Sequence, residues 1–166
     1  MIVVAPPLTF RTIDPVADGE VAASHHRDAC AVSFGTDRRW EGAERYLRGL
    51  AGRVEEFPDG HVLAFLDGRC VGQLELEVPY GKTVGYASLY YVTPDFRGRD
   101  FGRLLHEYAG RYFRSWEATE ARLHVSPTNE GAIGFYRAMG YRLTRVEPGA
   151  RGMWEMRCVV AQASRL

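Results

Sequence analysis

The chain has 166 residues, 46% of them hydrophobic, and its 21 basic side chains balance 21 acidic ones. A nonspecific nucleic-acid binder normally carries a basic excess, so the zero net charge argues against a nucleic-acid partner and favours small molecules or peptides. The length suits one domain, and three scattered cysteines without a CxxC pair indicate neither a disulfide framework nor a cysteine zinc site, so a cytoplasmic location is expected.

The first third of the chain predicts one short strand and two helices. Residues 8–13 have the composition of a strand, and residues 15–34 that of a helical region in which Pro15 suits the first turn. Apolar residues then recur every three or four positions over residues 40–54, as on an amphipathic helix. A Pro-Asp-Gly turn at residues 58–60 ends this helix.

The middle of the chain predicts a hairpin and a further strand. Residues 61–66 and 70–78 flank Asp67-Gly68-Arg69, a short turn in which Asp67-Gly68 is a strong short-range signal for a hairpin. Residues 84–92 form the next strand. A helix follows, because an apolar stripe with helical spacing runs from Phe101 to Trp116.

The last third predicts three strands and a short helix. A buried strand over residues 121–125 precedes a helix over 129–139, and strands follow over 141–146 and 153–160. The whole order predicts an α/β fold with a mixed, mostly antiparallel sheet of about six to seven strands and helices on both faces.

The segment Arg97-Gly98-Arg99-Asp100-Phe101-Gly102 lies between a strand and a helix and has the properties of an anion site. The first amides of a helix lack partners within it, and the helix dipole favours negative charge there. Gly98 and Gly102 let backbone approach an anion, and three arginines supply positive charge. Pyrophosphate is the favoured guest, although an ordinary solvated turn uses the same residue types.

Three segments, in this order, resemble the GNAT superfamily of acyl-CoA N-acyltransferases. Residues 97–102 match the pyrophosphate-loop pattern Q/R-x-x-G-x-G/A except at Asp100. Residues 123–129, LHVSPTN, are similar to the family's fifth strand, which ends in an asparagine that contacts the cofactor arm. Residues 132–141, AIGFYRAMGY, match the signature A-x-x-F/L-Y-x-x-x-G-F/Y, at the expected distance from Asn129.

The resemblance implies a single GNAT domain over residues 1–166 that binds acetyl-CoA and needs no metal. It assigns residues 1–83 to the acceptor side, 84–146 to the acyl-CoA-binding core and 147–166 to a C-terminal strand and tail. Its implied cofactor-binding residues are Tyr90, Tyr91, Val92, Arg97, Gly98, Arg99, Asp100, Phe101, Gly102, Arg103, Asn129 and Tyr136.

Asp100 departs from the family, which usually has glycine at this position. The position often needs a positive φ, and a carboxylate there would lie beside the pyrophosphate. We expect Asp100 to turn outward or to cap the following helix, which would leave the loop usable but weaker for coenzyme A.

Amine acylation requires one group that accepts a proton from the amine and another that protonates the departing thiolate. Tyr136, which matches the family's tyrosine, is the expected general acid. Without the resemblance, the simpler interpretation would be that Tyr136 is a half-buried core residue and that Asn129 only caps the helix. His124 is the candidate base, because an imidazole with a pKa of about 6.5 suits proton transfer. Strand alternation puts it opposite its neighbours but does not decide which layer it faces.

Glu75 is the alternative base, together with Glu77 on the same face of its strand, although such a pair is usually solvated. Tyr80, Tyr86 and Trp154 hint at an aromatic acceptor pocket near the early helices.

The expected activity is transfer of an acetyl group to a primary amine of a small molecule, amino acid or peptide, by direct attack in a ternary complex. The alternatives are an acyl-CoA-binding module without catalysis, and an acyltransferase with a longer donor or a hydroxyl acceptor. A homodimer would agree with many members of the family. The first residues lack a basic leader and no apolar run approaches about 18 residues, so neither secretion nor a membrane partner is expected.

Overall fold

The computed structural model describes residues 7–79, 81–149 and 152–162. Its strands are β1 (Thr9–Thr12), β2 (His61–Leu66), β3 (Arg69–Glu77), β4 (Val84–Val92), β5 (Glu120–Val125), β6 (Arg142–Val146) and β7 (Trp154–Val159). Its helices are α1 (Gly19–Phe34), α2 (Ala43–Glu56), α3 (Phe101–Ser115) and α4 (Glu130–Ala138), with short 3-10 turns η1 (Pro58–Gly60) and η2 (Pro94–Phe96). Tyr80, named above for the acceptor pocket, lies outside the described residues, as do residues 1–6 of the expected acceptor side and residues 150–151 and 163–166 of the expected C-terminal part.

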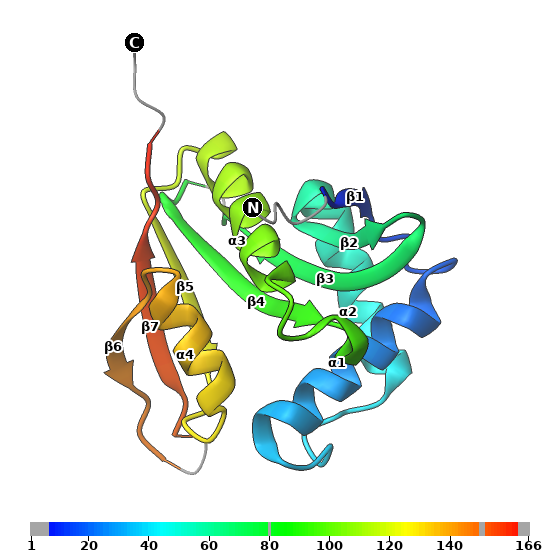
Figure 1. Ribbon diagram of the computed structural model, residues 1–166, viewed down its shortest axis with the longest axis horizontal. Helices are drawn as coiled ribbons and strands as arrows, with labels where there is room; N and C mark the ends of the chain where they lie inside the picture. The colour runs from blue at the N-terminus through cyan, green and yellow to red at the C-terminus, as the bar shows by residue number, and fades with distance from the viewer. Residues whose placement is uncertain (1–6, 80, 150–151, 163–166) are drawn as a thin grey trace, which may run out of the picture.

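The strands form one seven-stranded sheet in the order β1-β2-β3-β4-β5-β7-β6. β4 and β5 are parallel and are joined through α3, whereas every other neighbouring pair is antiparallel. Figure 1 shows β4 and β5 in the middle of the sheet, side by side where the two strands begin. The predicted α/β fold, with its mixed and mostly antiparallel sheet, is confirmed.

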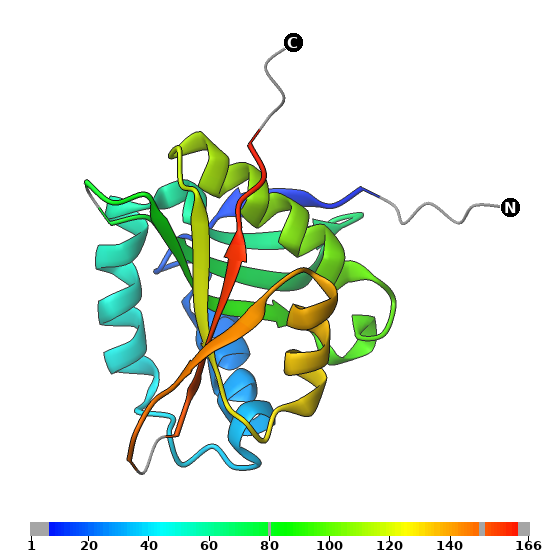
Figure 2. The ribbon, with the colours of Figure 1, turned by 90° about the vertical axis from the view of Figure 1, so that its left-hand side faces the viewer.

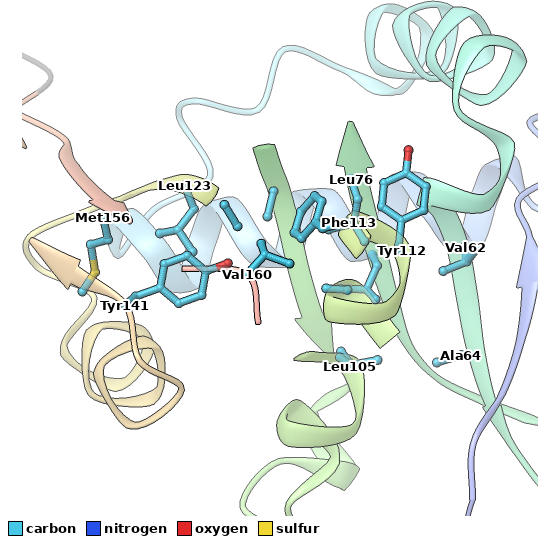
Figure 3. Close-up of a cluster of buried hydrophobic side chains, with 14 of the residues drawn as sticks. Val62, Ala64, Leu76, Leu105, Tyr112, Phe113, Leu123, Tyr141, Met156 and Val160 are labelled. Carbon is cyan, nitrogen blue, oxygen red and sulfur yellow. The ribbon is translucent and has the colours of Figure 1, made fainter. Parts of the chain in front are cut away.

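Helices cover both faces of the sheet, with α2 and α4 on opposite sides (Figure 2). Side chains alternate along β2 between these layers: Val62 and Ala64 belong to the core that includes α3, whereas Leu63 packs with α1 and α2. In the larger core, Phe113 of α3 lies near Leu76 of the sheet (Figure 3). Burial of each such side chain contributes about 1.5–3 kcal/mol.

Two turns test the local predictions. Asp67 and Gly68 have φ values of 48° and 78°, which confirms the predicted hairpin turn between β2 and β3, but Arg69, expected in the turn, is already the first residue of β3. Pro15, however, is not in the first helical turn, because α1 begins only at Gly19. The Asp14 carboxylate accepts the backbone N–H groups of the two residues after Pro15, at 2.9 and 3.0 Å, and this side chain holds a separate turn before the helix.

The pairing of β4 with β5 is short, and this positions the site. The two strands pair only from Val84 to Ala87 on β4 and then diverge, as Figure 1 shows. On its other side β4 has a bulge, because Ala87 pairs with Leu76 and Leu89 with Glu75, which leaves Ser88 unpaired. The second half of β4 therefore presents backbone groups to the gap instead of to β5.

Candidate active site

A cavity of about 690 Å³ fills the space between the diverging strands. This volume lies in the range of about 300–1,000 Å³ that is typical of small-molecule sites. The residues that line it come from the second half of β4, the loop before α3, α4, the end of β5 and one face of α1, and they include Tyr90, Tyr91, Val92, Arg97, Gly98, Asp100, Phe101, Gly102, Arg103, His124, Asn129 and Tyr136. Of the predicted site residues, the cavity therefore brings together all except Arg99 and Glu75.

The loop before α3 has the backbone expected of an anion cradle. Gly98 and Asp100 have positive φ values of 72° and 69°, and an added Cβ at Gly98 would meet no atom within 4 Å. Asp100 makes no capping hydrogen bond; its carboxylate accepts from Arg103 Nε at 2.7 Å and its side chain is 57% exposed. Of the two expectations for Asp100, helix capping is therefore wrong: the side chain is paired with Arg103 and exposed, and the residue also lines the cavity.

Two arginines of the loop, Arg97 and Arg99, make contacts with other residues of the protein. Arg97 donates from Nε to the Val92 carbonyl at 2.9 Å and from Nη2 to Asp28 of α1 at 2.7 Å. The Tyr91 hydroxyl also donates to Asp28, at 2.6 Å. Partial burial acts to raise the pKa of Asp28, but the hydrogen bonds from Tyr91 and Arg97 outweigh it and lower the pKa. Arg99 lies over the Phe96 ring, 5.4 Å from its centroid, outside the cavity lining.

Packing against α4 requires a glycine at position 102. A Cβ at Gly102 would lie 2.9 Å from Cε2 and 3.2 Å from Cζ of Phe135 on α4. Contacts as short as 2.9 Å do not occur for real Cβ atoms, so a side chain here would displace the ring. The absence of a side chain at Gly102 thus allows α3 to pack closely on α4 at the wall of the cavity.

Asn129 and Tyr136 reach the cavity from the two ends of α4. Asn129 is the N-cap residue: its Oδ1 accepts from the Ala132 N–H at 3.2 Å, and its Nδ2 donates to Ser33 Oγ of α1 at 3.3 Å. The Tyr136 ring packs edge-on against Tyr90, at a centroid distance of 5.7 Å. Burial raises the pKa of Tyr136, so its hydroxyl is protonated and available as a donor.

His124 lies on the opposite face of β5 from Leu123 and Val125, which belong to the core beneath α3 and α4. The open question of its orientation is therefore answered: its side chain faces the layer of α1 and lines the cavity. Its Nδ1 is 2.6 Å from the Tyr86 hydroxyl, and its Nε2 is 3.0 Å from Glu147 Oε1.

Glu75 lies elsewhere, in a buried network under α2. Its side chain is only 2% exposed, and it accepts hydrogen bonds from the Tyr46 hydroxyl at 2.5 Å and from Arg53 Nη2 at 3.0 Å. Gln73 donates to the same carboxylate at 3.0 Å. Burial first, and then the carboxylate, raise the pKa of Tyr46. These contacts give Glu75 a structural setting that the sequence did not indicate.

The family comparison assigns the chain with this splayed sheet and cavity to a class of acyltransferases. The chain belongs to the acetyltransferase (GNAT) family, whose model matches residues 23–141, well over half of the chain. It is 29% identical over 117 residues to an uncharacterized N-acetyltransferase of Methanocaldococcus jannaschii, across 68% of this chain and 50% of the relative, so the chain spans about half that relative's length. An uncharacterized N-acetyltransferase of Archaeoglobus fulgidus is 32% identical over 114 residues, which cover 66% of this chain and 74% of the relative.

Solved structures share the fold. PaiA N-acetyltransferase from Thermoplasma acidophilum, in complex with coenzyme A, matches with a TM-score of 0.74 and 18% identity over 93% of this chain and 99% of its own. Ard1 from Thermoplasma volcanium gives 0.76 and 20%, over 95% and 100%. The structure of yncA from Salmonella typhimurium with its cofactor acetyl-CoA gives 0.69 and 16%, over 97% and 98%. No helix in residues 7–79, 81–149 and 152–162 is long and apolar enough to cross a membrane.

Proposed function

We propose that this protein transfers an acetyl group from acetyl-CoA to a primary amine of a small molecule, amino acid or peptide. The observation that carries the proposal is the cavity between β4 and β5, where the loop at residues 97–103, Asn129 and Tyr136 meet. The coenzyme A complex of PaiA and the acetyl-CoA complex of yncA support the same class of ligand.

The residues present fit acetyl-CoA at both ends of the cavity. Gly98 and the first turn of α3 offer backbone amides to a pyrophosphate, and the open space above Gly98 leaves room for one. Near the other end, the bulge at Ser88 turns β4 so that backbone groups of residues 88–92 line the wall. Such groups suit the amides of the cofactor arm.

Acetyl-CoA supplies an acyl group already activated as a thioester. The chain's own residues position the reactants and move protons: Tyr136 donates a proton to the departing sulfur, and His124 receives the proton that the acceptor amine releases. A tyrosine with a raised pKa suits the first role, since it stays protonated until the sulfur becomes basic. Both side chains line the same cavity.

Thiol release during incubation with acetyl-CoA and a panel of amines tests the activity. We expect turnover with at least one amine, and a Tyr136→Phe variant should lose about 10²- to 10⁴-fold in kcat. Tyr141→Phe is the matched control, because Tyr141 is also buried with a raised pKa but does not line the cavity. Acetyl-CoA binding without turnover across the panel would instead favour a binding module, and equal kcat values for the Tyr136 variant and wild type would remove its assigned role.

A further inference from the structure

One carboxylate joins the helix α1 to the loop at residues 97–103. Asp28 of α1 accepts the Tyr91 hydroxyl at 2.6 Å and Arg97 Nη2 at 2.7 Å, both on its Oδ2. Figure 1 shows α1 beside the end of β4, from which the chain continues into this loop. Asp28 precedes Arg97 by 69 positions and lies in the part of the chain expected to serve the acceptor. It does not line the cavity, so any effect on a ligand must pass through its two partners, which do.

Three contacts fix the guanidinium of Arg97. Its Nε donates to the Val92 carbonyl at 2.9 Å and its Nη2 to Asp28, and its Cζ lies over the Tyr91 ring, 5.4 Å from the centroid. An arginine has five N–H groups, and these two hydrogen bonds use two of them. The other three make no hydrogen bond to the residues that the structure describes. They remain available to a ligand, because Arg97 lines the cavity.

The carboxylate of Asp28 is itself held in place. Tyr91 is only 6% exposed, and its ring stacks on His25 of α1 at a centroid distance of 4.6 Å. Burial, followed by the hydrogen bond to Asp28, raises the pKa of Tyr91, so its hydroxyl stays protonated and donates. A buried ring with a fixed hydroxyl therefore limits the movement of Asp28, and through it the movement of Arg97.

We propose that Asp28 is a positioning residue for acetyl-CoA, because it holds Arg97 so that the free N–H groups of the guanidinium meet the pyrophosphate. The inference rests on the proposed binding of acetyl-CoA in the cavity. A guanidinium can bind two phosphate oxygens at once through parallel N–H groups. An arginine that is already held in place loses less conformational entropy when the cofactor binds. Asp28 contacts no reacting atom in this arrangement and acts only through Arg97.

Asp28 also offsets part of the positive charge of Arg97, which would oppose the binding of an anion. Both side chains are well exposed, however, at 40% for Arg97 and 37% for Asp28, and solvent weakens the effect of such pairs. The hydrogen bond from Tyr91 takes up a further part of the charge of the carboxylate. The ordering of the long arginine side chain is therefore the larger effect, and loss of Asp28 should weaken the binding of coenzyme A.

Calorimetric titration with coenzyme A tests this inference. Asp28→Ala should weaken binding about 3- to 10-fold, as expected when one flexible side chain must be ordered by the ligand. Arg97→Met should cost about 10-fold or more, and the double variant should bind within about 2-fold of Arg97→Met, because Asp28 acts only through Arg97. Asp37→Ala is the matched control: Asp37 also accepts from an arginine, Arg27, at 2.7 Å, and neither of the two lines the cavity. Its affinity should stay within about 2-fold of the wild type.

Unchanged or tighter binding by Asp28→Ala would overturn the inference, as would losses of the two single variants that add in the double variant. Asp28→Asn keeps the shape of the side chain and provides the same comparison if alanine destabilises the fold. We expect its affinity to lie between those of the wild type and Asp28→Ala, and binding tighter than that of the wild type would show that the carboxylate withholds Arg97.

Nitrogen-15 NMR of the arginine side chains provides a readout that needs no cofactor. The Nε–H of Arg97 should exchange with water several-fold faster in Asp28→Ala than in the wild type or in Asp37→Ala, and equal rates would also overturn the inference. A wild-type protein that binds no coenzyme A would contradict the proposed acetyl transfer. If the wild type and Asp28→Ala bind coenzyme A equally well, only the role of Asp28 fails.

Discussion

Replacement of Gly102 by alanine tests whether the contact between α3 and α4 holds the cavity together. The new Cβ would lie 2.9 Å from the Phe135 ring, so the ring or its helix must shift. Overpacking of this kind costs about 1–3 kcal/mol. The gain in helix propensity is small in the first turn of α3, so a net loss of about 1–2 kcal/mol is expected.

Gly110→Ala is the matched control on the same helix. A Cβ there would meet only Nη1 of Arg114, at 3.2 Å, and this is the end of a flexible side chain. Because alanine is the better helix former by about 1 kcal/mol, this variant should be more stable than the wild type. The two identical substitutions on α3 are therefore expected to have opposite signs.

Thermal unfolding and isothermal titration with coenzyme A measure both effects. At about 2–4 °C per kcal/mol for a chain of this size, Gly102→Ala should melt about 2–8 °C lower, whereas Gly110→Ala should melt a few degrees higher. Displacement of Phe135 should also weaken coenzyme A binding about 10-fold or more, since the ring lines the cavity. Equal melting temperatures for the two variants would refute the packing argument.

Three further outcomes are expected. Asp100→Asn should bind acetyl-CoA about 3-fold more tightly by calorimetry, because it removes a carboxylate from the cradle while asparagine tolerates the positive φ; unchanged or weaker binding would contradict this. In Arg53→Met the buried Glu75 loses its guanidinium partner, and the free energy of unfolding in urea should fall by about 2–3 kcal/mol. The control Arg48→Met removes an exposed arginine and should lower this free energy by less than about 0.5 kcal/mol. Equal losses for the two variants would refute the stabilising role of the Glu75 network. Burial lowers the pKa values of His25, His26, His61 and His106, so near pH 6.5 only the unfolded chain binds these protons. The free energy of unfolding should fall below that pH by up to about 1.4 kcal/mol per pH unit for each of them, and a constant free energy from pH 7.5 to 5.5 would show that the folded histidines protonate freely.

Elements with a local signal were predictable from the sequence. The stripe from Phe101 to Trp116 and the Asp67-Gly68 turn depend on neighbours in the chain, and both formed where expected, although α3 ends at Ser115. The prediction that Pro15 lies in the first helical turn was wrong because the Asp14 carboxylate accepts hydrogen bonds from the backbone amides that follow Pro15 and forms a separate turn. The periodicity of apolar residues carries no information about such side-chain hydrogen bonds.

The site was predictable as a set of residues but not as a geometry. Alternation along β5 separated His124 from its neighbours, but the choice of face depends on which helices cover the sheet. Glu147 carried no signal, since its contact with His124 joins the connection after β6 to a strand 22 or more residues earlier. In the sequence, Glu75 and Glu77 look like a pair of solvent-exposed carboxylates on one strand face. Glu75 is buried because α2 packs over that face, which the local sequence does not indicate.

The short pairing of β4 with β5 has a mechanical consequence. Four backbone rungs, from Val84 to Ala87, are the connection within the sheet between strands β1–β4 and strands β5–β7. Beyond these rungs the two parts of the sheet meet through side-chain contacts, such as those of Asn129 with Ser33 and of Tyr136 with Tyr90. A ligand held by β4 and α3 on one side and by α4 on the other would add a further connection and would stiffen the whole sheet, not only its own binding site.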